Sequence, residues 1–160
     1  MERLARVTPT HMDREVLFLC TGNYYRSRFA EMYFNAQAVQ AGIEWRAVSR
    51  GIATELGADL PGPVSPLVPA RLSALGMASV IDTRAPMQLQ EGDLSAADLV
   101  IALDGTEHPP FMRQRFAAWA DRITYWDVPD AHLLKADAAL ARIAERVDTL
   151  LQQLSAGSQA

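Results

Sequence analysis

The sequence predicts an α/β domain built on a parallel sheet with helices on both faces. Two observations lead to this fold class. Short apolar runs at 15–20 and 97–104 are typical of buried strands, and segments of helical periodicity lie between and after them. Strands that alternate with helices are joined by right-handed crossovers, which make the strands parallel and cover both faces of the sheet.

The first half of the chain gives three elements and one long connection. Residues 15–20 form a strand, and a helix begins near Ser27 and ends at Gly42, with an apolar stripe made by Phe29, Met32, Ala36 and Val39. Residues 43–51 alternate in polarity, with Ile43, Trp45 and Ala47 on one face, and form a half-buried strand. Residues 52–69 contain four prolines and two glycines and form the longest irregular connection.

The second half continues the alternation. A helix is expected within 65–76, a central strand at 97–104, a helix after the two prolines of 106–120 and a strand within 122–130. The last element is a long amphipathic helix from Ala136, in which apolar residues recur at Leu140, Ile143, Val147, Leu150 and Leu154.

Size and composition indicate one globular domain. The chain has 160 residues, 49% hydrophobic and 21% charged, which are ordinary values for a domain with its own core. We expect a loosely held tail at 1–13, a single domain at 14–155 and a short tail at 156–160. The net charge of −4 argues against a nucleic-acid or membrane surface, because such surfaces need clustered lysine and arginine.

The cysteine content and the apolar runs favour a cytoplasmic protein. Cys20 is the only cysteine, so no internal disulfide can form. The first residues lack the apolar stretch of a secretory signal, and no apolar run reaches a membrane-spanning length.

The segment "CTGNYYRS" at 20–27 has the features of an anion-binding loop. Gly22 and Asn23 tolerate the positive φ of a tight loop, which turns successive N–H groups inward. The following helix N-terminus adds positive charge, and the planar guanidinium of Arg26 can grip two oxygens of a tetrahedral anion. Electropositive surroundings favour the thiolate of Cys20, which can accept a phosphoryl group, and Ser27 can donate a hydrogen bond to the sulfur.

Each candidate has a simpler structural explanation. A cysteine in a strand is usually a core residue, and an isolated aspartate near a proline usually belongs to a turn. What favours a site is the shared position. Cys20, Ser49, Asp104 and residues 127–130 all lie at or just past the ends of predicted strands, where open α/β sheets bind ligands. Asp130 is the preferred general acid, ahead of Asp127 and Asp104. The three histidines lack the spacing of metal ligands.

The sequence resembles the low-molecular-weight protein tyrosine phosphatase family. The resemblance rests on "VLFLCTGNYYRSRFAE" and continues through "VSRG", "ADLVIALD" and "DVPD" in the family's order. It implies a flavodoxin-like, doubly wound sheet of four parallel strands in the order 2-1-3-4. It also implies hydrolysis of a phosphotyrosine protein or a small aryl phosphate through a phosphocysteine, with no metal or other cofactor.

The resemblance also assigns roles to residues. Cys20 resembles the nucleophile, Arg26 the phosphate-gripping arginine and Asp130 the general acid. Substrate binding is implied for the rest of the loop: Thr21, Gly22, Asn23, Tyr24, Tyr25 and Ser27. Ser49 resembles the hydroxyl that supports Asn23.

Three departures from the family pattern stand out. Tyr24 and Tyr25 occupy the region where many members carry a second cysteine, so no disulfide can protect the thiol within the loop. Thr83 takes the place of a histidine that supports the asparagine, which changes or removes that support. Ala131 and His132 replace a proline and an aromatic residue after the acid, and the aromatic residues available as a substitute wall are Tyr24, Tyr25 and Trp45.

Two other functions fit the same residues. A catalytically weak phosphate- or phosphopeptide-binding protein would be consistent with the altered histidine and aromatic positions. Arsenate reduction is the less favoured alternative, because with one cysteine it would require an external thiol. The sequence does not specify an oligomeric state.

Overall fold

The strands form one parallel sheet in the order β2-β1-β3-β4. A computed structural model of the protein describes residues 14–130 and 134–159, and the tail expected at 1–13 lies outside these ranges. The central strand β1 (Arg14–Cys20) pairs with β2 (Trp45–Gly51) on one side and with β3 (Leu99–Ala102) on the other, and β3 pairs with β4 (Thr124–Tyr125). The predicted fold class and the strand order 2-1-3-4 are therefore confirmed.

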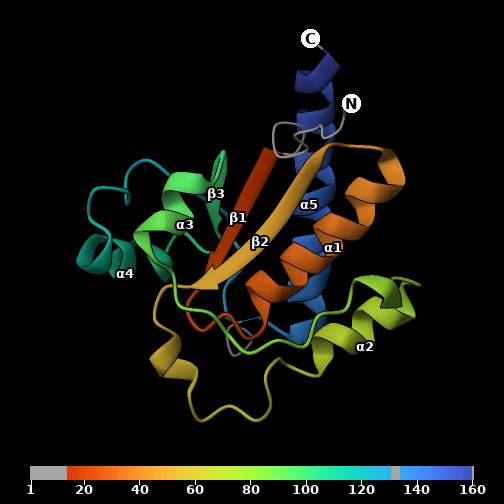
Figure 1. Cartoon of the computed structure of the whole chain (residues 1–160). Coiled ribbons are helices and arrows are strands. Elements are labelled where there is room, and N and C mark those ends of the chain that lie inside the picture. The colour runs from red at the N-terminus through yellow and green to blue at the C-terminus, as the bar shows by residue number, and fades with distance from the viewer. Residues whose placement is uncertain (1–13, 131–133, 160) are drawn as a thin grey trace, which may run out of the picture.

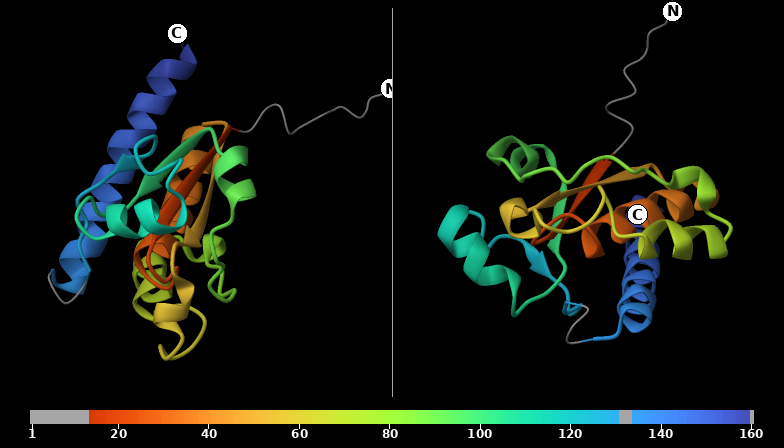
Figure 2. Two further views of the ribbon diagram at one scale, coloured as in Figure 1. Left: turned by 90° about the vertical axis from the view of Figure 1, so that its left-hand side faces the viewer. Right: turned by 90° about the horizontal axis from the view of Figure 1, so that it is seen from below.

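Helices cover both faces of this sheet. Figures 1 and 2 show α1 (Arg26–Ala41) and α5 (Ala136–Gln159) on one face, with α3 (Glu91–Ala96) and α4 (His108–Arg115) on the other. Side chains of β1 alternate between the two cores, because successive residues of a strand point to opposite faces. Val16 and Phe18 join the core under α1 and α5, whereas Leu17 and Leu19 join the core under α3 and α4.

The helix α1 is where the predicted apolar stripe is partly wrong. The helix ends as expected, since Gly42 adopts a left-handed conformation with φ of 70°. Phe29 and Met32 are buried, but Ala36 is only half-buried and the side chain of Val39 is 82% exposed. In the last turn of α1 the predicted stripe therefore faces solvent, and Ala38 is the buried residue instead of Val39.

The remaining elements differ from expectation mainly in length. Helix α2 (Leu67–Ala74) lies within the predicted range, whereas α4 stops at Arg115 and β4 has only two residues. The short helix α3 was not predicted. Helix α5 continues to Gln159, so it reaches into the range 156–160 expected as a tail.

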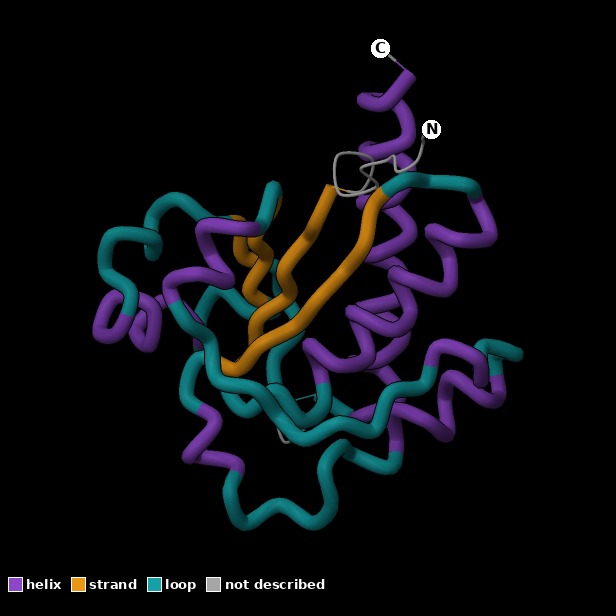
Figure 3. Tube along the Cα trace, in the orientation of Figure 1, coloured by secondary structure: helices purple, strands orange, loops and turns teal. Residues whose placement is uncertain are grey.

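Loops gather at one edge of the molecule. Figure 3 shows long irregular segments below the carboxyl ends of β1 and β2, including the connection that contains the short helix η2 (Thr54–Gly57). A second short helix, η3 (Ala78–Val80), follows α2. Within the described ranges, no helix has both the length and the apolar character needed to cross a bilayer.

Candidate active site

The loop between β1 and α1 curls tightly at the carboxyl end of the sheet. Asn23, at its centre, has a φ of 54° and is the only non-glycine residue with positive φ in the ranges 14–130 and 134–159. Asparagine tolerates this conformation better than most residues.

The polar groups of this loop point in opposite directions. Three carbonyl oxygens accept hydrogen bonds from the connection after β2: Cys20 from Ile52 N–H (2.9 Å), Thr21 from Ala53 N–H (2.9 Å) and Tyr24 from Ser65 N–H (3.0 Å). The N–H groups of residues 22–25 donate to no acceptor in the described part of the chain. Outward carbonyls and uncommitted N–H groups give the loop the polarity of an anion-binding nest.

The Cys20 sulfur lies at the base of this loop, next to a hydroxyl. Its Sγ is 2.9 Å from Ser27 Oγ. The amide nitrogen Nδ2 of Asn23 donates to the same Ser27 oxygen at 2.9 Å. A hydroxyl oxygen that accepts from Asn23 keeps its own hydrogen, which can donate to the Cys20 sulfur when that sulfur is a thiolate. Ser27 therefore stabilises negative charge on Cys20.

Both polar atoms of the Asn23 side-chain amide are held by hydrogen bonds. Its Nδ2 also donates to Ser49 Oγ at 3.0 Å, and Ser49 donates in turn to Glu31 at 2.6 Å. Its Oδ1 accepts from Arg84 Nη1 at 3.1 Å and from Met87 N–H at 3.0 Å. Donors on one side and acceptors on the other fix the orientation of the amide.

Arg84 supplies the support of Asn23 that was expected to change or disappear with Thr83. The support for Asn23 is not lost, since the guanidinium one residue later supplies it, whereas Thr83 is exposed. Arg84 Nη2 also lies 3.2 Å from Glu31 Oε1 and 3.2 Å from Ser49 Oγ, so one arginine contacts Asn23, Ser49 and Glu31 together.

Arg26 is buried and turned toward the loop. Its Nη1 donates to the Val128 carbonyl at 2.9 Å and its Nη2 to Glu107 Oε2 at 2.8 Å. These bonds fix the plane of the guanidinium but engage only two of its five N–H groups. The others remain able to bind an oxyanion.

Two hydrogen bonds converge on one carboxylate oxygen of Glu107, and an imidazole lies close to it. Besides Arg26, the hydroxyl of Thr21 makes a short hydrogen bond to Oε2, and His108 Nε2 lies 3.4 Å away. Burial by itself raises the pKa of Glu107, but the interactions with His108, Arg26 and Thr21 prevail and hold the pKa far below its usual range. Glu107 therefore stays ionised and orients Arg26.

A cavity of about 300 Å³ opens above the loop. It brings together three predicted catalytic residues, Cys20, Arg26 and Asp130. The other lining residues come from the loop, from the connection after β2 and from the first residue of α2: Thr21, Gly22, Tyr24, Tyr25, Leu56, Gly57, Leu60 and Leu67. Of the remaining predicted site residues, Asn23, Ser27 and Ser49 are fully buried beside this cavity. They hold the loop in place through hydrogen bonds to one another.

Other candidates lie elsewhere. Asp127 pairs with Arg146 at 2.9 Å, and Asp104 accepts hydrogen bonds from the N–H groups of the two residues before α4. Trp45 cannot form a wall of the cavity, because it pairs with Arg14 at the opposite end of β1 from Cys20. The replacements Ala131 and His132 lie outside the described residues. Within the described ranges, no three His, Cys, Asp or Glu side chains cluster in a way that could hold a metal ion.

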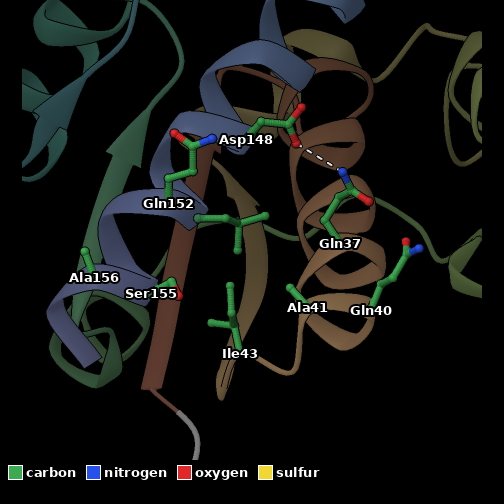
Figure 4. A pocket seen from close by; sticks show the side chains of 9 residues that line it. Gln37, Gln40, Ala41, Ile43, Asp148, Gln152, Ser155 and Ala156 are labelled. Carbon is green, nitrogen blue, oxygen red and sulfur yellow. Dashed lines mark hydrogen bonds between the residues drawn. The ribbon is translucent and has the colours of Figure 1, made fainter. Parts of the chain in front are cut away.

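A second and larger hollow lies between α1 and α5. Its volume is about 740 Å³, and its lining combines glutamines with apolar side chains such as Ile43 and Leu151. Figure 4 shows Gln37 of α1 and Asp148 of α5 pointing toward each other across one end of it, joined by a hydrogen bond of 3.1 Å. None of the residues of the Cys20 cavity lines this hollow.

The sequence analysis gave no role in the site to Glu107 or Arg84. Glu107 follows a predicted strand by a few residues, so its position at the rim was a usable signal. Arg84 stands in an irregular segment, and no periodicity or spacing indicates that its side chain turns inward to Asn23.

Comparison with known proteins places this geometry in a family. The sequence profile of the low molecular weight phosphotyrosine protein phosphatases matches residues 15–160, nearly the whole chain. The protein belongs to this family. Membership makes it a phosphatase that uses a cysteine nucleophile. A search among curated protein sequences gives no match.

Solved structures agree with the family assignment. The low molecular weight protein tyrosine phosphatase of T. tengcongensis is 29% identical, with a TM-score of 0.71 over 88% of this chain and 99% of its own. YfkJ of Bacillus subtilis is 24% identical, with a TM-score of 0.76 over 96% of this chain and 99% of its own. The YwlE arginine phosphatase of Geobacillus stearothermophilus is 20% identical, with a TM-score of 0.71 over 91% of this chain and 96% of its own. The last two likenesses support the fold alone.

Proposed function

We propose that this phosphatase hydrolyses phosphotyrosine or a similar aryl phosphate monoester through a phosphocysteine intermediate. The observation that carries the proposal is the single cavity lined by Cys20, Arg26 and Asp130 above a loop of uncommitted N–H groups. A nucleophile, an anion clamp and a carboxyl group on one cavity are the parts that phosphoryl transfer to sulfur requires.

In the first step the Cys20 thiolate attacks phosphorus, so that an S–P bond forms while the bond to the phenolic oxygen breaks. Arg26 and the N–H groups of the loop bind the three outer oxygens and stabilise the charge that spreads over them. Asp130 gives its proton to the leaving phenolic oxygen.

In the second step the roles of the acid and the sulfur reverse. Asp130, now a carboxylate, takes a proton from a water molecule that attacks phosphorus, and the S–P bond breaks. The thiolate that leaves is stabilised by the hydroxyl of Ser27, 2.9 Å from the sulfur. Inorganic phosphate and the starting protonation state result.

The walls of the cavity favour an aromatic ester. Leu56, Leu60 and Leu67 line it together with Tyr24 and Tyr25, which suits a flat apolar ring. Asp130 is the one carboxylate among the described lining residues, so a phosphorylated guanidinium would find little compensating negative charge beyond it.

The chemistry is tested by replacing the nucleophile and the acid. Cys20→Ser should abolish hydrolysis of p-nitrophenyl phosphate while calorimetry still detects phosphate binding. Asp130→Asn should slow hydrolysis by roughly 10²-fold or more for esters with poor leaving groups, and less for good ones. Equal turnover by wild type and Cys20→Ser would refute the proposal, and phosphate binding with slow hydrolysis of every ester would favour a binding protein instead.

The aryl preference is tested with matched substrates and variants. Wild type should hydrolyse a phosphotyrosine peptide faster than the matched phosphoarginine peptide. Leu60→Ser should raise KM for the phosphotyrosine peptide, because Leu60 lines the cavity, whereas Leu75→Ser, at a similarly exposed leucine of another region, should not. Faster hydrolysis of phosphoarginine would assign the enzyme to the other substrate class.

A further inference from the structure

Arg28 is a buried cation that the proposed mechanism does not use. It lies in the first turn of α1, and its side chain is fully buried. Burial of a charged group is costly unless hydrogen bonds or an opposite charge compensate for lost hydration. No carboxylate oxygen in the described ranges lies within 4.0 Å of its guanidinium, and its Nε has no partner there. All its hydrogen bonds in that part of the chain go to backbone oxygens, and the negative charges of Glu31 and Asp82 act on it only from beyond that distance.

These hydrogen bonds join three separate segments. Nη1 donates to the carbonyl oxygens of Asn23 at 3.3 Å and Pro63 at 3.2 Å, and Nη2 donates to that of Asp82 at 3.0 Å. Asn23 belongs to the anion-binding loop and Pro63 to the connection that lines the cavity. Asp82 precedes the segment that carries Arg84. One side chain therefore ties the loop to both of the segments that support it.

The bond to Asn23 also fixes the direction of a peptide group. In a planar trans peptide the C=O and the following N–H point in opposite directions. Because the Asn23 carbonyl faces Arg28, the N–H of Tyr24 points away from Arg28. That N–H has no acceptor in the described ranges, and Tyr24 lines the cavity that holds Cys20.

The positive charge of Arg28 also favours a negative group at the loop, as the direction of the Asn23–Tyr24 peptide does. Burial, together with repulsion from Arg84, lowers the pKa of Arg28, but an arginine stays protonated at physiological pH. Its charge interacts favourably with a negative Cys20 sulfur. The peptide direction and the charge both favour an anion over the loop.

We propose that Arg28 is a positioning residue for oxyanion binding: it holds the Asn23 carbonyl outward and so presents the Tyr24 N–H to a phosphate group. The inference rests on the proposed function only in taking the bound anion to be the phosphate of the substrate.

The test compares phosphate binding in four proteins: wild type, Arg28→Met, Arg28→Lys and Val147→Ala. Val147 is buried in α5, so its truncation lowers stability without touching the loop. Calorimetry gives the affinity for inorganic phosphate, thermal unfolding gives the stability, and the amide resonance of Tyr24 reports the N–H itself.

In wild type and Val147→Ala, phosphate should shift the Tyr24 amide resonance and bind with the same affinity within about twofold. Arg28→Met should bind phosphate at least about tenfold more weakly, the effect of losing one charge-assisted hydrogen bond, and the Tyr24 shift should shrink. Arg28→Lys, which keeps the charge but lacks the planar fork, should fall between the two. If Arg28→Met does not fold, the lysine variant decides in the same way.

Two outcomes would overturn the inference: an unchanged Tyr24 shift in the Arg28 variants, or an equal loss of affinity in Val147→Ala, which would reduce Arg28 to a purely structural role. Hydrolysis of p-nitrophenyl phosphate by wild type is measured in parallel. An enzyme that hydrolyses the ester but fails the Arg28 comparison refutes this inference alone. A protein that passes the comparison without hydrolysing any ester refutes the proposed function alone.

Discussion

At the residue scale, the site depends on side chains that each serve several partners. Asn23 contacts two serines with one end of its amide and Arg84 with the other. Glu107 accepts hydrogen bonds from both Thr21 and Arg26. A substitution at such a residue releases several groups at once, so its effect should be larger than that of one lost hydrogen bond.

Glu107→Gln should show this effect as a change in pH-dependent stability. In the folded protein the pKa of Glu107 lies far below its usual range, so the unfolded chain binds a proton first, near pH 4 (roughly). A depressed pKa contributes stability above that pH and loses it as the pH falls. The difference in unfolding free energy between wild type and Glu107→Gln should therefore be largest near neutral pH and shrink toward pH 3 (roughly).

Urea unfolding at a series of pH values measures this difference. Glu145→Gln is the matched control, because Glu145 is an exposed carboxylate of α5 whose recorded ion pair is with its neighbour Arg146 at 3.8 Å. A gap between wild type and Glu107→Gln that stays constant over the acid range would contradict the role given to Glu107.

At the element scale, the sequence predicts best what periodicity encodes. The apolar runs of β1 and β3 and the spacing of apolar residues in α5 identify those elements, because each buries a continuous face. Helix α3 escapes prediction because six residues are too few to show a helical period, although a capping box formed by Gln90 and Asp93 marks its start. Val39 was misplaced because periodicity does not show where a neighbouring element ends.

The same limit applies to the site. The strand, the loop and Cys20 with Arg26 were predicted, because their chemistry is encoded in one short segment. The contacts of Arg84 and Glu107 depend on how distant segments of the chain meet at the rim of the cavity. Arg84 is 61 residues from its partner Asn23 in the sequence, and Glu107 is 81 residues from its partner Arg26. Local pattern carries no information about such contacts.

The junction between β2 and the loop gives a prediction at this scale. A Cβ atom on Gly51 would lie 2.9 Å from the Thr21 carbonyl oxygen and 3.0 Å from Asn23 Cβ, so the loop backbone would have to move. Gly51→Ala should lower stability by about 1–3 kcal/mol, the usual effect of overpacking, and should also weaken phosphate binding. Calorimetry and thermal unfolding measure the two effects.

Gly92→Ala is the control for this substitution. Gly92 lies in α3, and a Cβ there would meet nothing within 4 Å. The variant should gain up to about 1 kcal/mol, because alanine is the better helix former, and should bind phosphate as wild type does. Unchanged phosphate binding in Gly51→Ala would show that the loop does not depend on close packing against β2.

At the scale of the whole molecule, α5 is fastened to the site helix by two phenols. Tyr25, the residue that precedes α1, donates to the carbonyl oxygen of Ala136 at the start of α5. Further along, Tyr33 of α1 donates to both oxygens of Asp148, at 3.0 Å each. Both contacts require a protonated phenol, so the attachment of α5 should weaken in alkali.

The pKa shifts define the range in which this happens. Burial raises the pKa of Tyr33 to about 12, and the hydrogen bond and negative charge of Asp148 add to the effect. In the unfolded chain the phenol ionises near its ordinary value of about 10. A raised pKa contributes stability that is fully present below pH 10 (roughly) and is lost as the pH rises toward about 12.

Tyr33→Phe separates this contribution from the rest of the molecule. Near neutral pH the variant should be less stable than wild type by about 1.5–3 kcal/mol, the net value of a hydrogen bond to a charged acceptor. Because phenylalanine cannot ionise, its stability should fall less between about pH 10 and the pH of about 12 at which Tyr33 titrates, so the two unfolding curves should converge. Denaturant unfolding followed by tryptophan fluorescence measures both proteins across this range. Parallel curves would mean that Tyr33 does not carry the alkaline sensitivity.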